Sequence, residues 1–390
     1  MKRLSWLVLA LTACGDVTTT AIDAAATDAT VGDDARIDAG APRCGDHNRT
    51  QGEVCFGAPL SLIGTGVVYD ARLADIDADG DLDVVYLIGD QFVAHVNSGG
   101  AFAPAGLPGA TTAGQRVLAR DLNNDGRAEL INQSSSAIEL WRADAGGFRH
   151  TRTGTVSPPT RGVPGGVVFA ELDGAAPAEL VGVYPGSLVV GKSGAGLTLT
   201  LGSGVAFSSG AGAALAAARF DGDALDDIVV GGAGGIVLYR GLAGGFAPVL
   251  VTAVSTAVNA VAAGDYNHDG TTDLAFVESN GLGMMRGAGG GAFLGAIRRS
   301  IDGARPAIAT GDVDGDGFDD VVLGVSNAGV HSIAILRGLD TGSLAQPVMI
   351  PIAVAPDYLH VDGDINGDGA PDLIVTNINA QTVLIVPSDP

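Results

Sequence analysis

Short apolar runs separated by turn residues recur along the chain, and they lack the 3.6-residue period of an amphipathic helix. In the clearest series, residues 258–263 and 273–277 flank an acidic loop, and a Gly turn then leads to residues 282–286. A Gly-rich stretch that ends at Phe293 leads to a fourth run. Apolar runs of this length between turn residues are typical of strands. The pattern therefore predicts a unit of four short strands.

The acidic loop between the first two runs recurs seven times, with starts at residues 75, 121, 171, 219, 265, 312 and 364. Successive starts lie 46 to 52 residues apart. A repeat of this length with four short strands is typical of one blade of a β-propeller. Six of the seven residues directly before the loops are Ala or Gly, as expected for inner strands that crowd around a narrow axis. We predict an all-β fold in which residues 56–390 form a seven-bladed β-propeller of four-stranded blades.

The two ends of this array complement each other. The last copy stops after its third strand, at residues 382–386, whereas residues 56–62 resemble the fourth-strand segment 246–251 and precede the first copy. An open last blade would expose an apolar edge that invites aggregation. We therefore expect residues 59–63 to pair beside residues 382–386 and close the ring.

The loops follow the pattern Asp-x-[Asp/Asn]-x-Asp-Gly-x-x-[Asp/Glu]. Positions 1, 3, 5 and 9 offer side-chain oxygens, position 7 can offer a carbonyl, and Gly at position 6 permits a sharp turn. Ca²⁺ takes six to eight oxygen ligands, which such a loop can supply. Five copies fit, and the ligands predicted from them are Asp75, Asp77, Asp79, Asp83, Asp121, Asn123, Asp125, Glu129, Asp265, Asn267, Asp269, Asp273, Asp312, Asp314, Asp316, Asp320, Asp364, Asn366, Asp368 and Asp372.

Two known calcium-loop types fit this pattern less well. An EF-hand needs flanking helices and Glu at position 12, where this chain has Tyr, Asn, Phe, Leu or Val inside a strand pattern. A β-roll repeats every nine residues. Copy three has Ala175 at position 5, and copy four has Arg219 at position 1 and Ala224 at position 6. Calcium in these two copies is left open, and Arg219 is a candidate to place its cation where calcium would sit.

These repeats resemble the FG-GAP or VCBS family, the seven-bladed propeller also found at the N-terminus of integrin α chains. The resemblance covers residues 56–390. It implies a calcium-braced propeller used outside the cell in adhesion or in contact with carbohydrate.

Composition limits the partners of the protein. The chain has 44 acidic and 21 basic residues, a net charge of −23, and this charge disfavours nucleic acid and anionic membrane surfaces. Five Ca²⁺ ions would add about +10, so much of the acidity is accounted for as ligand. Aromatic residues make up only 5% and Gly counts 60, which fits many small strands joined by tight turns.

The N-terminus predicts export. Lys2 and Arg3 precede an apolar stretch too short to span a bilayer, and residues 11–14 resemble the lipobox of bacterial lipoproteins. We expect cleavage after residue 13, lipid on Cys14, and a disordered acidic tether over residues 14–43. Cys44 and Cys55 are expected to form a small disulfide loop in an oxidising compartment. The predicted location is the bacterial cell envelope, at the outer membrane or cell surface, with the membrane contacted only through the lipid.

Catalytic motifs are weak. Residues 186–193 match a P-loop pattern, but a P-loop needs a preceding strand and a following helix, whereas residues 188–190 themselves resemble a strand. The six histidines show no metal-ligand spacing. We expect a monomeric, calcium-stabilised binding or adhesion propeller for a protein or glycan partner, and not an enzyme. Two alternatives stay open: a propeller-fold polysaccharide lyase or glycoside hydrolase, and a structural spacer of the envelope.

Overall fold

A computed structural model describes residues 54–63, 66–109, 113–144, 150–157, 165–175, 178–194, 197–201, 205–206, 212–242, 245–251, 254, 256–279 and 281–388. The predicted signal peptide, lipidated Cys14, tether and Cys44 lie outside these ranges, so they stay predictions. Cys55 is described and buried, at 6% exposure.

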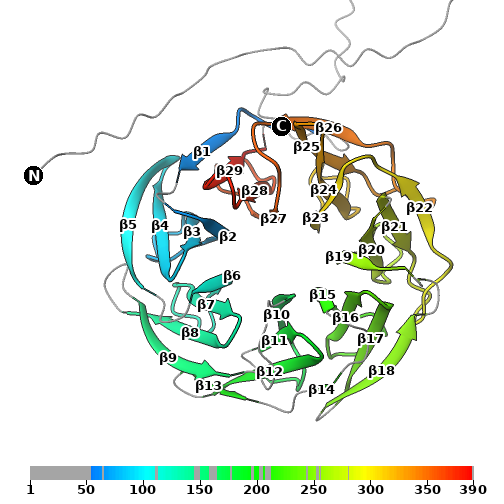
Figure 1. Ribbon diagram of the computed structural model, residues 1–390, viewed down its shortest axis with the longest axis horizontal. Helices are drawn as coiled ribbons and strands as arrows, with labels where there is room; N and C mark the ends of the chain where they lie inside the picture. The colour runs from blue at the N-terminus through cyan, green and yellow to red at the C-terminus, as the bar shows by residue number, and fades with distance from the viewer. Residues whose placement is uncertain are drawn as a thin grey trace, which may run out of the picture.

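Seven antiparallel sheets surround a central axis (Figure 1), which confirms the predicted seven-bladed all-β propeller. From the axis outward the strands of the first three blades are β2 (Val68–Ala74), β3 (Asp83–Ile88), β4 (Gln91–Ser98) and β5 (Ala101–Gly109); β6 (Gly114–Arg120), β7 (Glu129–Ser134), β8 (Ile138–Ala143) and β9 (His150–Val156); and β10 (Gly166–Ala170), β11 (Glu179–Tyr184), β12 (Ser187–Gly194) and β13 (Thr198–Leu201). A short extra strand, β14 (Val205–Ala206), also pairs with β12, so blade three departs from the expected four strands.

The other blades keep four strands each. They are β15 (Gly212–Ala218), β16 (Asp227–Gly232), β17 (Gly235–Leu242) and β18 (Gly245–Val251); β19 (Val258–Gly264), β20 (Asp273–Glu278), β21 (Gly281–Met285) and β22 (Ile297–Ser300); β23 (Ala304–Gly311), β24 (Asp320–Asn327), β25 (Val330–Leu336) and β26 (Val348–Ile352); and β27 (Tyr358–Gly363), β28 (Asp372–Asn377), β29 (Thr382–Val386) and β1 (Leu60–Ile63).

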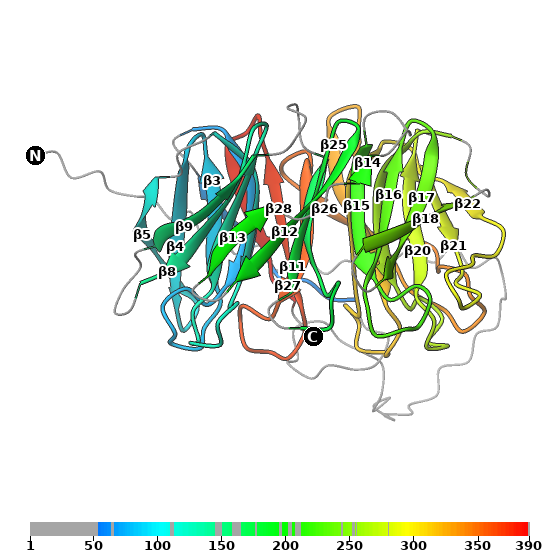
Figure 2. The ribbon, with the colours of Figure 1, turned by 90° about the horizontal axis from the view of Figure 1, so that it is seen from below.

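Burial accounts for the apolar runs. The second strand of each blade is covered by the neighbouring blades. All residues of β7, β11, β16 and β28 are buried. The rim strand β22 is mostly exposed. Seven apolar clusters each join two adjacent blades, for example through Phe92 of blade one and Trp141 of blade two. The core is thus a ring of interfaces between blades, and Figure 2 shows these blades side-on.

The predicted ring closure is confirmed. Strand β1 pairs antiparallel with β29, and the register runs from Leu60 opposite Ile385 to Ile63 opposite Thr382. Figure 1 shows this N-terminal strand as the outermost strand beside the C-terminal blade. The paired β29 is buried over its whole length. The described residues contain no helix long and apolar enough to span a bilayer.

Candidate calcium loops and the ring they form

Each acidic loop connects the innermost strand of a blade to the second strand, so that all seven lie on one face of the ring. We number them one to seven, as residues 75–82, 121–128, 171–178, 219–226, 265–272, 312–319 and 364–371. Position 9 of the motif is then the first residue of the second strand. Ser388, near the C-terminus, donates to Asp372 at the end of loop seven, so this face carries the C-terminal end of the chain, below in Figure 2.

The position-9 carboxylate ties each loop to its blade. In loop one, Asp83 accepts a hydrogen bond from the Ile76 NH at 2.9 Å and another from the Asn97 NH, at the end of the third strand, at 2.8 Å. Asp320 repeats the arrangement in loop six. All seven position-9 residues are buried, between 0% and 3% exposed. The sequence therefore uses one buried acid to hold the loop against two strands.

Burial and neighbouring acids perturb these carboxylates. Burial, together with the charges of Asp77 and Asp79, raises the pKa of Asp83 to about 6, against the hydrogen bonds from the Ile76 and Asn97 NH groups, which lower it. Burial likewise raises the pKa of Asp273 to about 6 and that of Asp320 to about 7. These acids therefore keep their protons to a higher pH than ordinary carboxyl groups, and a nearby cation would favour their ionised form.

The position-1 aspartate shapes the loop. Asp75 accepts hydrogen bonds from the Ala78 NH at 2.7 Å and the Gly80 NH at 3.0 Å. Asp121, Asp265, Asp312 and Asp364 also accept the NH of the position-6 glycine. Gly80 has φ of 94°, a conformation that glycine adopts without strain. The motif thus encodes a tight turn, held by hydrogen bonds from its own NH groups to the position-1 aspartate, in which the carboxylates point toward one another.

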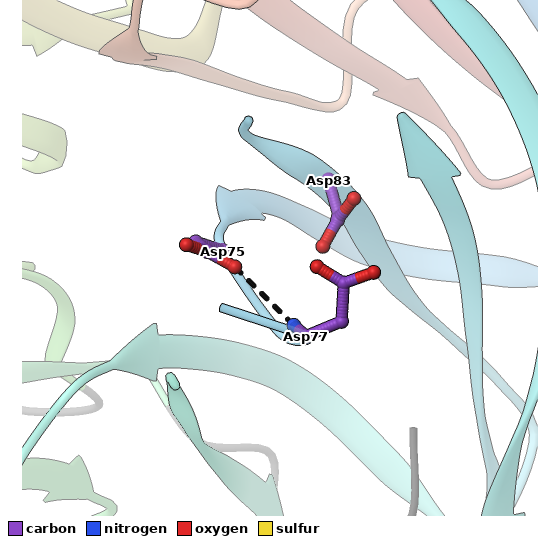
Figure 3. Close-up of side chains that lie close together, drawn as sticks. All are labelled: Asp75, Asp77 and Asp83. Carbon is purple, nitrogen blue, oxygen red and sulfur yellow. Dashed lines mark hydrogen bonds between the residues drawn. The ribbon is translucent and has the colours of Figure 1, made fainter. Parts of the chain in front are cut away.

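The structure brings some predicted ligands together directly. Oxygens of Asp75, Asp77 and Asp83 lie within 4.8 Å of one another, and Figure 3 shows the carboxylates of Asp77 and Asp83 facing each other. Asp312, Asp314 and Asp316 form a second such group. These donors are hard oxygens, the type that Ca²⁺ prefers, so the residues present fit the ion.

Loops two, five and seven carry Asn at position 3 instead of Asp. Its amide nitrogen donates to an acid of the same loop, from Asn123 to Glu129, from Asn267 to Asp269, and from Asn366 to Asp368. The amide oxygen accepts the position-5 NH in each case. In these loops the structure therefore joins the position-3 amide to one acid of the same loop, and the acids of loops two, five and seven are not among the described groups whose oxygens lie within 4.8 Å of one another.

The two divergent loops differ from each other in the structure. The Arg219 Nε of loop four lies 3.6 Å from Asp226 at position 8, and the Arg219 side chain is 57% exposed. The structure thus places this guanidinium beside Asp226 and not among the position 3, 5 and 9 acids, contrary to the role considered for it. Loop three does form an acidic group, from Glu171, Asp173 and Glu179. Its neighbour Lys192, the lysine of the P-loop-like string, lies in strand β12, which confirms that the string is no P-loop.

Adjacent loops are also joined to one another. The Ala128 NH of loop two donates to the Asp75 carbonyl of loop one at 2.8 Å, and the Asp226 NH of loop four donates to the Glu171 carbonyl of loop three at 2.7 Å. The Asp226 carboxylate accepts the Glu171 NH in return. These bonds, which the repeat pattern alone did not reveal, connect candidate cation sites in pairs.

Comparison with known families identifies the repeat. The sequence pattern described as "FG-GAP-like repeat" matches residues 75–132, 219–276, 265–323 and 312–375, which together make up more than half of the chain. The chain belongs to the FG-GAP-like repeat family. No curated protein matches it.

Solved structures resemble this FG-GAP-like propeller in fold alone. A lectin of Agrocybe aegerita, described by its specific recognition of non-reducing terminal N-acetylglucosamine, has a TM-score of 0.56 at 17% identity, over 80% of this chain and 86% of the lectin. Saccharomyces cerevisiae Sqt1 has a TM-score of 0.59 at 12% identity, over 85% of this chain and 98% of Sqt1.

The inner strands of the FG-GAP-like propeller carry a second polar group that sequence reasoning missed. Asp70 of β2 is 1% exposed and lies 2.8 Å from the His360 Nε2 of β27. Arg116 of β6 stacks 3.9 Å from the Tyr358 ring centroid, and its Nη2 donates to the Gly165 carbonyl. Blades one, two, three and seven are therefore joined near the axis by polar contacts. No local spacing marks these residues, because they lie on different repeats.

Proposed function

We propose that this FG-GAP-like propeller is a calcium-braced binding module and not an enzyme. The observation that carries the proposal is the convergence of acids in the loops between the first and second strands, where half-buried Asp75 and Asp77 and buried Asp83 lie within 4.8 Å of one another. Loops one, two, five, six and seven would each hold one Ca²⁺ through the acids and amides at positions 1, 3, 5 and 9. The ion supplies positive charge that offsets like-charge repulsion in each loop.

Calcium in this proposal rigidifies the ring, and the ring presents a surface to a protein or glycan. Support for a glycan comes from the fold shared with a lectin and from the family's resemblance to adhesion propellers.

We further propose that the chain is exported and anchored to the bacterial envelope through Cys14, with Cys44 and Cys55 forming a disulfide. In this proposal it works as a monomer and binds no nucleic acid.

Calcium titration of the metal-free protein tests the first part. Saturation at 100 times the Kd should stabilise the fold by about 2.7 kcal/mol per site, and chelator should lower the melting temperature. Asp320→Asn should lower the number of bound ions by one, whereas Asp340→Asn, at an exposed residue outside the loops, should leave it unchanged. An unchanged melting temperature after verified metal removal would contradict the calcium proposal.

A glycan array probed with residues 44–390, with calcium and with chelator, tests the second part. We expect binding that depends on calcium and leaves the oligosaccharide intact. Cleavage of the bound oligosaccharide would instead support the lyase or hydrolase alternative. Mass analysis of membrane fractions tests the lipid on Cys14.

A further inference from the structure

Loop three combines an acidic group with a basic side chain. Glu171, Asp173 and Glu179 approach within 4.8 Å of one another, and the Lys192 Nζ lies 2.8 Å from Asp173 Oδ2 and 3.6 Å from Glu179 Oε1. Glu179 is buried, with 4% of its side chain exposed, while half of the Lys192 side chain is exposed. The ammonium therefore sits over the acids from the solvent side.

Strand pairing within blade three sets the position of Lys192. Strand β12 pairs with β11 in a register that sets Gly191 opposite Leu180, so Lys192 follows at the level of Glu179, the first residue of β11. The same strand pairs Lys192 with Thr200 of β13. Because strands fix the lysine on both sides, its position relative to the loop is set by the sheet and not by a flexible segment.

Loop three also differs from the five fitting copies at the motif positions that offer ligands. Ala175 replaces the acid at position 5, and Glu171 replaces Asp at position 1, where its carboxylate accepts the Gly174 NH at 2.8 Å. We propose that Lys192 is the built-in cation of loop three, whose ammonium takes the place of Ca²⁺, so that blade three needs no metal. This inference rests on the proposed function, because it assumes that calcium has this role in the other loops.

A corresponding arginine in blade six offers the matched comparison. Arg337 directly follows the third strand of that blade, and its Nη1 lies 3.4 Å from Asp314 Oδ2. Loop six, however, keeps aspartate at positions 1, 3, 5 and 9 and Gly317 at position 6. We therefore expect Arg337 to neighbour an ion-binding loop, whereas Lys192 replaces the ion.

Counting bound Ca²⁺ by equilibrium dialysis of the full chain tests the substitution. The variants are Ala175→Asp with Ala176→Gly, which restores the position-5 acid and the position-6 glycine, the triple variant that adds Lys192→Met, and the control Arg337→Met. We expect the variant with the restored loop and Arg337→Met to bind as many ions as the wild type, and the triple variant to bind one more. An extra ion in the restored loop that keeps Lys192, or none in the triple variant, would overturn the proposal.

Thermal melting in chelator provides a second readout. Lys192→Met should lower the melting temperature of the metal-free protein. Lys192→Arg should leave the melting temperature close to that of the wild type, because arginine keeps the positive charge. An unchanged melting temperature in Lys192→Met would overturn the proposal. If the wild type binds no calcium, the proposed function fails, whereas the triple variant still reports whether loop three binds an ion once Lys192 is removed.

Discussion

The carboxylate of Asp319 in loop six accepts a hydrogen bond from the backbone NH of Asp265 in loop five at 2.8 Å, and the Asp319 NH donates to the Asp265 carbonyl at 3.1 Å. Gly264 permits this approach, since a Cβ there would lie 2.9 Å from the Cβ of Asp319. The rings of His268 and Phe318 also meet between the two loops. The position-1 ligand of loop five is thus held by the neighbouring loop.

Removing the Asp319 carboxylate should therefore destabilise the fold. Asp319→Ala leaves the Asp265 NH without its acceptor, and we expect a loss of about 1–3 kcal/mol in the free energy of unfolding, measured by urea denaturation in calcium. Asp319→Asn keeps an acceptor oxygen and should lose less. Asp340→Ala, at an exposed residue of the same blade, should stay within about 0.5 kcal/mol of the wild type. Equal losses in Asp319→Ala and Asp340→Ala would contradict the role of the interloop bond.

The stability of the metal-free protein should fall as pH rises. Burial raises the folded-state pKa of Asp83 and Asp273 from 3.8 to about 6, and that of Asp320 to about 7. Between the unfolded and folded pKa values the folded state binds more protons, so the contribution of these groups is full below about pH 4 and lost by about pH 8. We expect the urea midpoint in chelator to drop between about pH 5 and pH 8.

Calcium should remove this drop, because the ion and the protons compete for the same carboxylates. An asparagine side chain cannot titrate. Asp320→Asn should therefore make the drop in the urea midpoint with rising pH smaller in chelator. A chelated midpoint that rises between about pH 5 and pH 8 would show that other groups dominate.

Deleting the closing strand should cost far more stability than deleting the tether. A protein that lacks residues 1–63 loses β1 and exposes the edge of β29, including Val383 and Ile385, which are buried at 0% and 2%. A protein that lacks residues 1–43 keeps the closure. We expect a clearly lower melting temperature and aggregation only in the longer deletion. Equal melting temperatures would disprove the importance of this closure.

Asp70 should be required at the seam between the first and last blades. Burial raises its pKa, but the charges of Arg72 and His360 lower it to about 2 overall. Asp70→Ala removes the buried acceptor beside the His360 Nε2 and the negative charge near Arg72, and it should cost about 3 kcal/mol near neutral pH, measured by urea unfolding. Because the folded-state pKa is lowered, this contribution should fade as pH falls from about 4 to 2. Asp90→Ala, at an exposed turn, serves as the control and should show neither effect.

The sequence by itself determined the blades and the ring closure. Each acidic loop is a local motif in which Asp75 accepts the Gly80 NH within a few residues, and the spacing predicted the grouping of acids in loops one and six. The closing strand was predictable too, because one end of the array lacked a strand and the other end had a spare one.

Only the tertiary structure decided what surrounds the loops. The Asp319–Asp265 bond joins different blades, the Asp70–His360 contact spans 290 residues, and Lys192 reaches Asp173 across a strand pairing. These contacts depend on the register between strands and on the angle between blades, which no local spacing encodes. For the same reason Arg219, the first residue of a divergent loop, lies beside Asp226, whereas the lysine that reaches an acidic loop comes from the third strand of its blade.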